Sequence, residues 1–349
     1  MFLFRSVNRR RSALAGAVTV ILLTIGAAGP AAACGGLIGE NGSIRLVRTT
    51  TLAGWHDGVE HYVTSFEFSG SGKAVGSIIP LPGVPTSVEA AGKWTLQRLQ
   101  REVSPPVLRA EGAQSLTAAS SASVLLTTEV GALNITVLKG GGDEVGKWAL
   151  DNGFFLTPDA PEVLDFYAQR SPIFLAAKFD AERAAAQGLN GGDGTPIDIT
   201  IPLDRPWVPL RILGLGLPAA NQVQADVFLL TDDRPTVLTG SGMGIERSQA
   251  ASASLMNDLR SDRNTTWMPQ NMWLTHLVLN DTAGNLKYDL SAGVEGRAPS
   301  PTAAGYRDIK PLDVPSSGWG VKSYLAVLGA VLLAGTVVGF GRRVVLRRA

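Results

Sequence analysis

The chain has 349 residues with 31 basic and 30 acidic side chains, and its formal net charge is +1. A single cysteine excludes a disulfide bond within one chain, and a region of this length buries a large core without one. All 30 acidic residues lie between Glu40 and Asp313. Of the 31 basic residues, four precede Ser12 and five lie at or after Lys322, so 22 basic residues remain between these ends and the net charge of that middle region is −8. That charge excludes the basic surface that nucleic acids require.

The first 33 residues have the pattern of a secretory signal peptide. Arginines at 5 and 9–11 precede an apolar stretch from Ser12 to Gly29, and Ala31 and Ala33 form an A-x-A cleavage site. We therefore expect an exported protein, with the Sec and twin-arginine routes both open. Cleavage would leave Cys34 at the start of the mature chain, where lipidation of its thiol stays an open alternative.

Strands dominate the predicted elements that follow. The pair Asp57-Gly58 is a two-residue hairpin signal between two β-branched and aromatic stretches. A helix is expected after it, capped by Thr86 or Ser87 and carrying apolar residues at three- to four-residue spacing as far as Val103. The predicted elements of this part are strands at 44–47, 50–55, 59–68 and 75–81, a helix at 86–103, a loop at 110–122, and a strand-like stretch at 124–138 that is interrupted at Gly131.

The second part mixes short helices with further strands. Asp143 is expected to cap the first helix, which ends at Asn152-Gly153, and Pro161 opens the second. A loop is expected at 187–194 and a turn at 281–284, where the last two strands meet. The remaining predicted elements are strands at 173–179, 197–201, 207–215, 223–230, 272–279 and 286–290 and a helix at 248–259.

A second apolar stretch, from Ser323 to Phe340, contains no charged residue. About 18 residues at about 1.5 Å each extend about 27 Å, close to the thickness of a bilayer's hydrocarbon core. Four arginines follow Gly341, and the positive-inside rule places them in the cytoplasm. We expect a transmembrane helix at 321–341, a basic cytoplasmic tail at 342–349, and a Pro/Ser/Gly-rich stalk at 294–320 outside the cell membrane.

These elements predict an α+β fold, in which a mostly antiparallel β domain with a few short helices precedes one C-terminal transmembrane helix. The domain would span residues 34–293. Residues 79–85 resemble residues 201–209, so the domain could consist of two similar halves, about 35–122 and 123–293, although chance explains so short a match equally well.

Several short motifs keep a fixed order along the chain. They are Ala33-Cys34-Gly35-Gly36, Trp55 near Asp57-Gly58, Ile79-Pro80-Leu81-Pro82 with Pro85, Trp148-Ala149-Leu150 with Asn152-Gly153-Phe154, and Asp204-Arg205-Pro206 with Pro209-Leu210-Arg211. In these motifs residues 33 to 290 resemble DUF2330, a family of exported bacterial proteins. Two departures are the missing second early cysteine and His56, which separates Trp55 from Asp57. The resemblance implies an envelope location and a mixed α+β exported domain, and it implies no activity.

The densest group of metal-ligating side chains lies around the predicted hairpin. Folding on Asp57-Gly58 pairs His56 with Val59 and Gly54 with His61, so the two imidazoles share one face within about 7 Å. Two protein ligands are fewer than the three or four that structural and catalytic zinc sites use, and the spacing differs from the H-E-x-x-H of metalloproteases. We therefore expect an exposed polar hairpin tip and predict no catalytic, cofactor-binding or metal-binding residues.

Other candidates are weaker. Met268, Met272 and His276 would line one face of a helix and suit Cu(I), but Pro269 favours a strand that places His276 in the core. The glycines at 140–142 are interpreted as a connector, and Asp232-Asp233 as an exposed turn.

The sequence thus favours a membrane-anchored extracytoplasmic protein that binds or scaffolds in the bacterial envelope without catalysing a reaction. Its expected partners are membrane lipid, through the C-terminal helix, and an envelope protein, but not nucleic acid; no cofactor is expected. The alternative is an envelope hydrolase or metal-dependent enzyme that uses His56 and His61.

Overall fold

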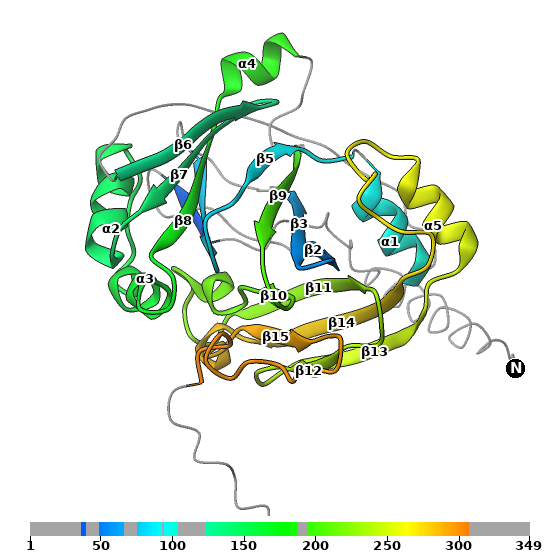
Figure 1. The fold of residues 1–349 in the computed structure, drawn as a ribbon. Helices are drawn as coiled ribbons and strands as arrows, with labels where there is room; N and C mark the ends of the chain where they lie inside the picture. Colours follow the sequence, from blue (N-terminus) through cyan, green and yellow to red (C-terminus); the bar gives the residue numbers. More distant parts are fainter. Residues whose placement is uncertain are drawn as a thin grey trace, which may run out of the picture. The chain divides into compact units, whose positions relative to one another are not determined.

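The computed structural model describes residues 36–39, 49–65, 75–92, 94–103, 123–187 and 195–306. Seven strands form the larger sheet in the order β13-β14-β11-β2-β3-β9-β5 (Figure 1). All neighbours in it are antiparallel except β2 and β11, which run parallel. In that order the strands span Met243–Ala250, Trp273–Thr282, Gln222–Thr231, Thr49–His56, Val59–Ser65, Pro196–Pro202 and Ser87–Ala90.

The second sheet has five strands in the order β1-β4-β8-β7-β6, and all of its neighbours are antiparallel. These strands span Gly36–Gly39, Val75–Leu81, Ile173–Phe179, Leu133–Lys139 and Ser123–Val130. A small third sheet pairs β15 (Leu290–Gly293) with β10 (Trp207–Val208) and β12 (Thr236–Leu238).

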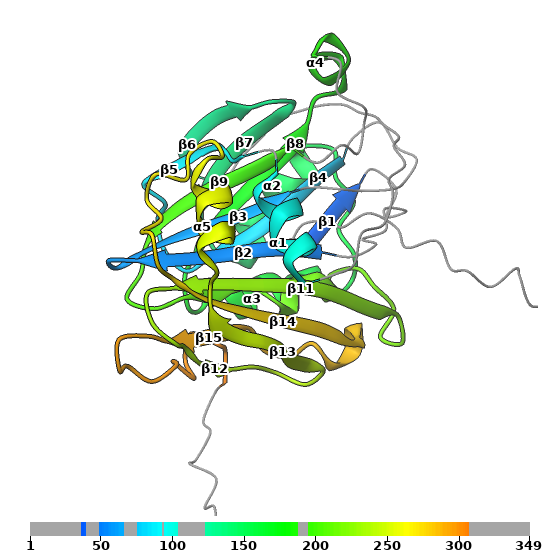
Figure 2. The same ribbon diagram turned by 90° about the vertical axis from the view of Figure 1, so that its right-hand side faces the viewer.

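The two large sheets face each other across the main core. Strand periodicity decides which side chains enter it: Val227 and Leu229 point between the sheets, whereas Phe228 and Leu230 point to the opposite face of the larger sheet. On that opposite face lie helices α1 (Thr95–Val103) and α5 (Ala253–Arg260), as Figure 2 shows.

Helices α2 (Gly142–Asp151) and α3 (Ala160–Ala168) cover the outer face of the five-stranded sheet in the same way. The result is a four-layer arrangement of helices, sheet, sheet and helices. Three short helical segments complete the described elements: α4 (Ala181–Ala186) and the 3₁₀ turns η1 (Arg211–Gly214) and η2 (Ala283–Asn285).

Most local sequence signals are confirmed. Asp57 and Gly58 both have positive φ, 48° and 78°, as the twist-matched turn of a two-residue hairpin requires. The strands at 75–81 and 173–179 and the helices expected at Asp143 and Pro161 are present, and Gly131 turns β6 into β7 with φ 55°. The first of these helices is capped by Gly141, so the prediction of Asp143 as its cap is wrong. The fold is α+β and mostly antiparallel, as predicted.

The predicted helix at 86–103 is wrong in its first half. Val88 pairs with Ile199 as part of strand β5, and the helix begins only at Thr95. The start of this helix is set by a residue remote in sequence. The Asp262 carboxylate accepts hydrogen bonds from the backbone N–H groups of Trp94 and Thr95 and from the Thr95 hydroxyl. The N-cap residue predicted from local sequence is therefore replaced by a tertiary contact.

Three other elements differ from expectation. Residues 243–250 are strand β13, and the helix expected from 248 starts at Ala253, where Ser252 caps it. The strand expected at 207–215 ends after Val208. The N–H groups of Leu210 and Arg211 donate to the buried Asp289 carboxylate instead of to a neighbouring strand. The strand expected at 286–290 is β15 at Leu290–Gly293, and it pairs with β10 and β12 instead of β14. Helix α4 was not expected.

Several predicted segments lie outside the described residues: the signal peptide at 1–33 with Cys34, the strand at 44–47, the loop at 110–122, the transmembrane helix at 321–341 and the tail at 342–349. The loop predicted at 187–194 is described only at Gln187, and the stalk predicted at 294–320 only as far as residue 306. In the part of the chain that is described, no helix combines the length and apolar character needed to cross a bilayer.

Candidate functional site

The β2–β3 hairpin ends beside the loop that follows β11. Strands β2 and β11 are parallel neighbours, and Gly54 is paired with Leu230. Two residues further along, His56 at the end of β2 therefore lies beside Asp232, the first residue after β11. Because parallel strands bring their carboxyl ends to the same edge of a sheet, this pairing places the hairpin turn and the Asp232 loop together.

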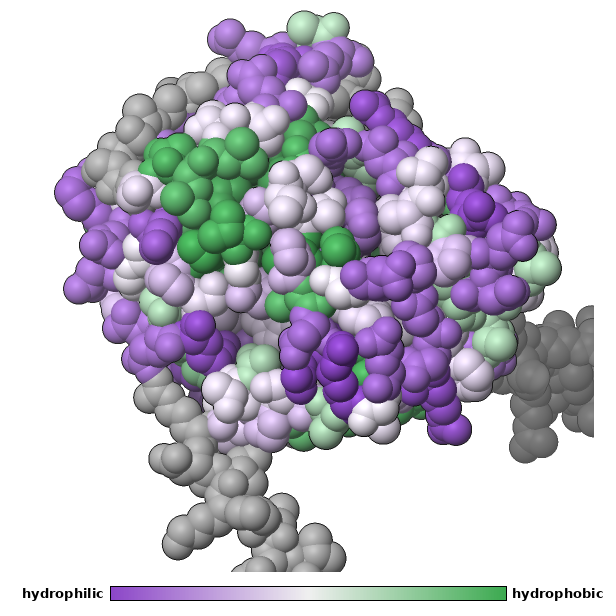
Figure 3. All heavy atoms as spheres, in the orientation of Figure 1, coloured by the Kyte–Doolittle hydropathy of each residue, from purple (hydrophilic) through white to green (hydrophobic). Residues whose placement is uncertain are grey.

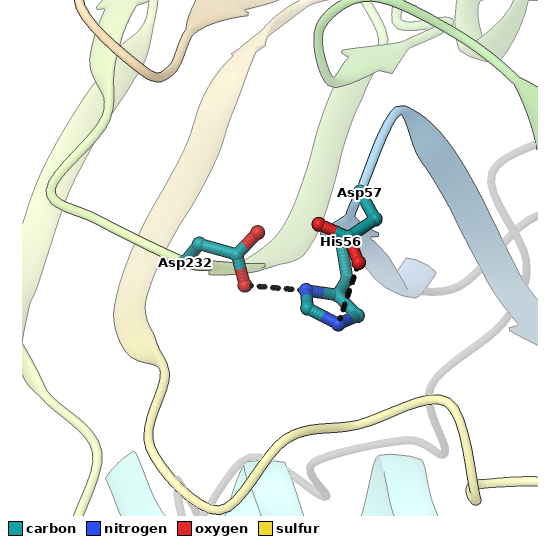
Figure 4. A group of neighbouring side chains, drawn as sticks. All are labelled: His56, Asp57 and Asp232. Atoms are coloured by element: carbon teal, nitrogen blue, oxygen red, sulfur yellow. Dashed lines mark hydrogen bonds and ion pairs between the residues drawn. The ribbon is translucent and has the colours of Figure 1, made fainter.

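His56, Asp57 and Asp232 form a compact cluster at this edge (Figure 4). Nδ1 of His56 lies 2.7 Å from Oδ1 of Asp232, and Nε2 lies 3.5 Å from Oδ2 of Asp57. One ligand atom from each residue lies within 4.8 Å of the other two. An imidazole and two carboxylates at this separation are a set that a divalent cation can use.

His61 lies on the same face as His56, as the predicted register requires, but it has its own partners. Its Nδ1 is 3.0 Å from Oδ2 of Asp198 on the neighbouring strand β9. The indole of Trp267 stacks on the imidazole, with ring centroids 4.2 Å apart and an interplanar angle of 3°. The structure therefore does not unite the two histidines with a common partner.

Glu60 lies on the opposite face of the hairpin and is completely buried, which the expectation of an exposed hairpin tip missed. Its Oε2 accepts a hydrogen bond of 2.6 Å from the backbone N–H of Trp207, while Oε1 has no hydrogen-bond partner among the described residues. Burial raises the pKa of Glu60 from 4.5 to about 8. The side chain is therefore largely protonated and uncharged at neutral pH.

The strand interpretation of His276 is confirmed. It lies on β14 and is buried, its Nε2 is 2.9 Å from Oδ1 of Asp226, and its ring stacks against Phe228. Met268 and Met272 are buried in the core beneath α1 and α5. Each of the chain's three histidines thus faces one aspartate from another strand or loop.

The glycines at 140–142 lead into α2. The backbone N–H of Gly141 donates to the Glu144 carboxylate, so the first turn of this helix is closed by its own side chain.

An apolar patch lies on β6, the edge strand of the five-stranded sheet. Val124, Leu125 and Leu126 are 48%, 42% and 37% exposed. Figure 3 shows hydrophobic side chains gathered over this part of the molecule. The edge strand β13 of the larger sheet differs, because its exposed Ile245 is followed directly by Glu246 and Arg247.

Sequence reasoning identified His56, His61 and His276 but missed Asp198 and Asp226, and it interpreted Asp232 only as part of an exposed turn. In sequence, Asp198 is 137 positions from His61, Asp226 is 50 positions from His276, and Asp232 is 176 positions from His56. No local spacing connects such positions. Only the strand order of the larger sheet could have revealed these pairs.

Comparison with known proteins places the chain in a family without assigning an activity. No curated protein matches the sequence. Among solved structures, the crystal structure of baculovirus P35 has a TM-score of 0.35 and 10% identity, covering 71% of this chain and 93% of that chain, which is too weak a likeness to carry an argument. The model of the family described as "Uncharacterized protein conserved in bacteria (DUF2330)" matches residues 28–248. With more than half of its length matched, the chain belongs to the DUF2330 family.

Proposed function

We propose that the chain is an exported protein of the bacterial envelope, anchored by a helix at 321–341, whose outer domain binds another envelope polypeptide without catalysing a reaction. Three sequence features support export and anchoring: the A-x-A site after the first apolar stretch, the uncharged second stretch and the four arginines behind it. The family description supports a bacterial protein.

The observation that carries the binding role is the apolar edge strand β6. Edge strands of monomeric proteins are normally protected by charged side chains, bulges or a covering segment, as β13 is by Glu246 and Arg247. From Ser123 to Thr128 β6 carries no charge, and its first five residues are exposed. The three exposed aliphatic side chains of β6 are consecutive, and such a contiguous apolar patch is typical of a surface that a partner covers.

The occupant that fits β6 is an extended, uncharged segment of a second polypeptide. Such a segment would add a strand to the sheet through main-chain hydrogen bonds and would cover the aliphatic side chains. A charged segment would place its charges against Val124 and Leu126 without a counter-ion. β6 itself has one such protective device, a bulge between these two residues in its pairing with β7, so regular addition of a strand is expected from Leu126 onward.

Crosslinking in intact cells tests this proposal. A photoreactive amino acid replaces Leu125 on β6, and in a control chain it replaces Ile245 on β13, which is also exposed on an edge strand. We expect one discrete adduct from position 125 that disappears when Leu126→Lys is added, and none from position 245. The Lys variant must keep its circular dichroism spectrum.

Three results would overturn the proposal. They are adducts of equal yield from both positions, an adduct with twice the chain's mass, which would identify a second copy, and protection of the domain from protease added to whole cells. Each result contradicts a separate element: the site, the kind of partner, or the exported location.

A metal-dependent envelope enzyme is the second candidate function, because His56 has a carboxylate beside each ring nitrogen. Loss of a measurable hydrolytic activity in both His56→Gln and His61→Gln would favour it. The engagement of His61 with Asp198 and Trp267 makes a structural role for that residue the better-supported one.

A further inference from the structure

His56 differs from the other two histidines in how its ring is surrounded. The His61 and His276 side chains are 14% and 7% exposed, and each stacks against an aromatic ring. The His56 side chain is 31% exposed, and Asp57 beside it is 84% exposed. A dissolved ion can therefore reach the His56 ring and the Asp57 carboxylate directly.

The two ring nitrogens of His56 have different tasks in this geometry. Nδ1 is 2.7 Å from Asp232, a distance at which a protonated Nδ1 donates to the carboxylate. A neutral imidazole with its proton on Nδ1 has its lone pair on Nε2. Metal-bound histidines typically donate their second N–H to a carboxylate in this way, which fixes the tautomer and orientation of the ring.

Nε2 and the nearer oxygen of Asp57 are separated by the gap that a metal ion would fill. Two ligands at about 2.0–2.1 Å from zinc and at a tetrahedral angle lie about 3.4 Å apart. The observed separation of Nε2 and Oδ2 is 3.5 Å. The remaining coordination positions would face solvent and hold water.

The charge of the cluster also favours a cation. Asp57 and Asp232 bring two carboxylates together, and among the described residues no lysine or arginine is paired with either one. The Asp57 backbone lies in the hairpin turn with φ 48°, which directs its Cβ atom but leaves its side chain 84% exposed. A donor set of imidazole and carboxylate suits zinc and its neighbours in the first transition series, whereas calcium and magnesium prefer oxygen ligands alone.

We propose that the end of the β2–β3 hairpin binds a divalent transition-metal ion of the zinc type, with Nε2 of His56 and the Asp57 carboxylate as ligands and Asp232 as the residue that orients the imidazole. This site does not depend on the partner-binding role of β6. With two protein ligands it is an open, exchangeable site and differs from a closed structural zinc site.

Calorimetric titration of the full-length chain tests the site. The protein is purified in detergent, stripped with a chelator, and titrated with zinc chloride and, separately, with calcium chloride. We expect one zinc per chain, much weaker calcium binding, and a zinc-dependent rise in Tm. His56→Gln and Asp57→Asn should each remove measurable zinc binding, and Asp232→Asn should weaken it about 10- to 100-fold.

His61→Gln is the matched control, because it makes the same change on the same face of the same hairpin. It should leave the zinc affinity and the zinc-dependent Tm shift within about twofold of the wild type. Circular dichroism of the chelator-treated variants separates loss of a ligand from loss of the fold. The proposal is overturned if wild-type protein takes up no zinc, if His56→Gln binds zinc like the wild type, if His61→Gln loses as much as His56→Gln, or if calcium binds equally well.

Discussion

Gly54 on β2 lies directly beneath the indole of Trp267: a Cβ atom on Gly54 would come within 2.1 Å of the indole Cη2. Gly54 is also the cross-strand partner of His61, on which the same indole stacks. The missing side chain at position 54 therefore leaves the space in which Trp267 lies flat over the hairpin and covers His61. A substitution here acts on the His61–Trp267 stack without touching either residue.

Gly54→Ala should destabilise the protein by about 1–3 kcal/mol, because the indole must move and a well-packed site becomes overfilled. The free energy of unfolding in urea measures the effect. Gly244→Ala on β13 is the control, since a Cβ there meets nothing within 4 Å, and its effect should stay within about 0.5 kcal/mol. Equal values for the two variants would show that Trp267 does not occupy the space above Gly54.

The buried carboxyl of Glu60 predicts a pH-dependent stability. Its pKa is 4.5 in the unfolded chain and about 8 in the folded protein, so the native state keeps a proton that the unfolded state loses. The stabilisation is complete below pH 4.5 and is lost as the pH rises towards 8, by at most about 1.4 kcal/mol per pH unit. Asp289 shows the same sign with a folded pKa of about 6, so the range from pH 6.5 to 8 belongs mainly to Glu60.

Unfolding of wild type and Glu60→Gln at pH 6.5 and pH 8 isolates this contribution. We expect the wild type to lose about 1–2 kcal/mol more than Glu60→Gln between the two pH values. For each variant we compare the change in unfolding free energy between the two pH values and not its absolute size, because the buried donors of the glutamine amide lower stability at every pH. Parallel slopes would mean that Glu60 is already ionised in the folded protein.

Local chemistry decided which parts of the fold could be predicted. Asp57-Gly58 sets a turn whose two positive φ values fix the register of the whole β2–β3 hairpin, so the shared face of His56 and His61 follows from six residues of sequence. Strands buried on both faces, such as 173–179, are marked by continuous apolar residues.

The candidate metal cluster could not be predicted in the same way. Asp232 reaches His56 only because β11 is the parallel neighbour of β2, a pairing between segments 176 residues apart in sequence. The same limitation explains the late start of α1, whose N-terminal N–H groups are satisfied by Asp262 and not by a neighbouring cap residue. Long-range partners leave no spacing pattern in the chain.

The proposed membrane anchor predicts in which cell fraction two shortened chains are found. A chain ending at residue 320 should leave the membrane fraction, because the uncharged stretch at 323–340 is gone, whereas a chain ending at residue 341 should remain there. Immunoblots of carbonate-washed membranes measure both. If the shorter chain stays in the membrane, Cys34→Ser in the same background decides whether a lipid on that thiol retains it; retention of this double variant would contradict the anchor.

Asp289 joins the α3 helix to the segment after β10. Its completely buried carboxylate accepts four hydrogen bonds, from the Tyr167 hydroxyl at 2.8 Å, Nη2 of Arg170 at 2.9 Å, and the N–H groups of Leu210 and Arg211 at 2.9 and 3.1 Å. Burial raises the pKa of Asp289 to about 6 even though Arg170 and these donors lower it. All four donors depend on one carboxylate for their acceptor.

Asp289→Asn should therefore destabilise the protein by about 3–5 kcal/mol, because it removes the charge that Arg170 faces and turns an acceptor into a donor among donors. Urea unfolding at pH 7.5, where the carboxyl is ionised, measures the loss. Asp143→Asn, an exposed acidic residue in the first turn of α2, should change stability by less than about 0.5 kcal/mol. A loss below about 1 kcal/mol for Asp289→Asn would mean that water or a rearranged loop satisfies these donors, and the turn after β10 would then need another explanation.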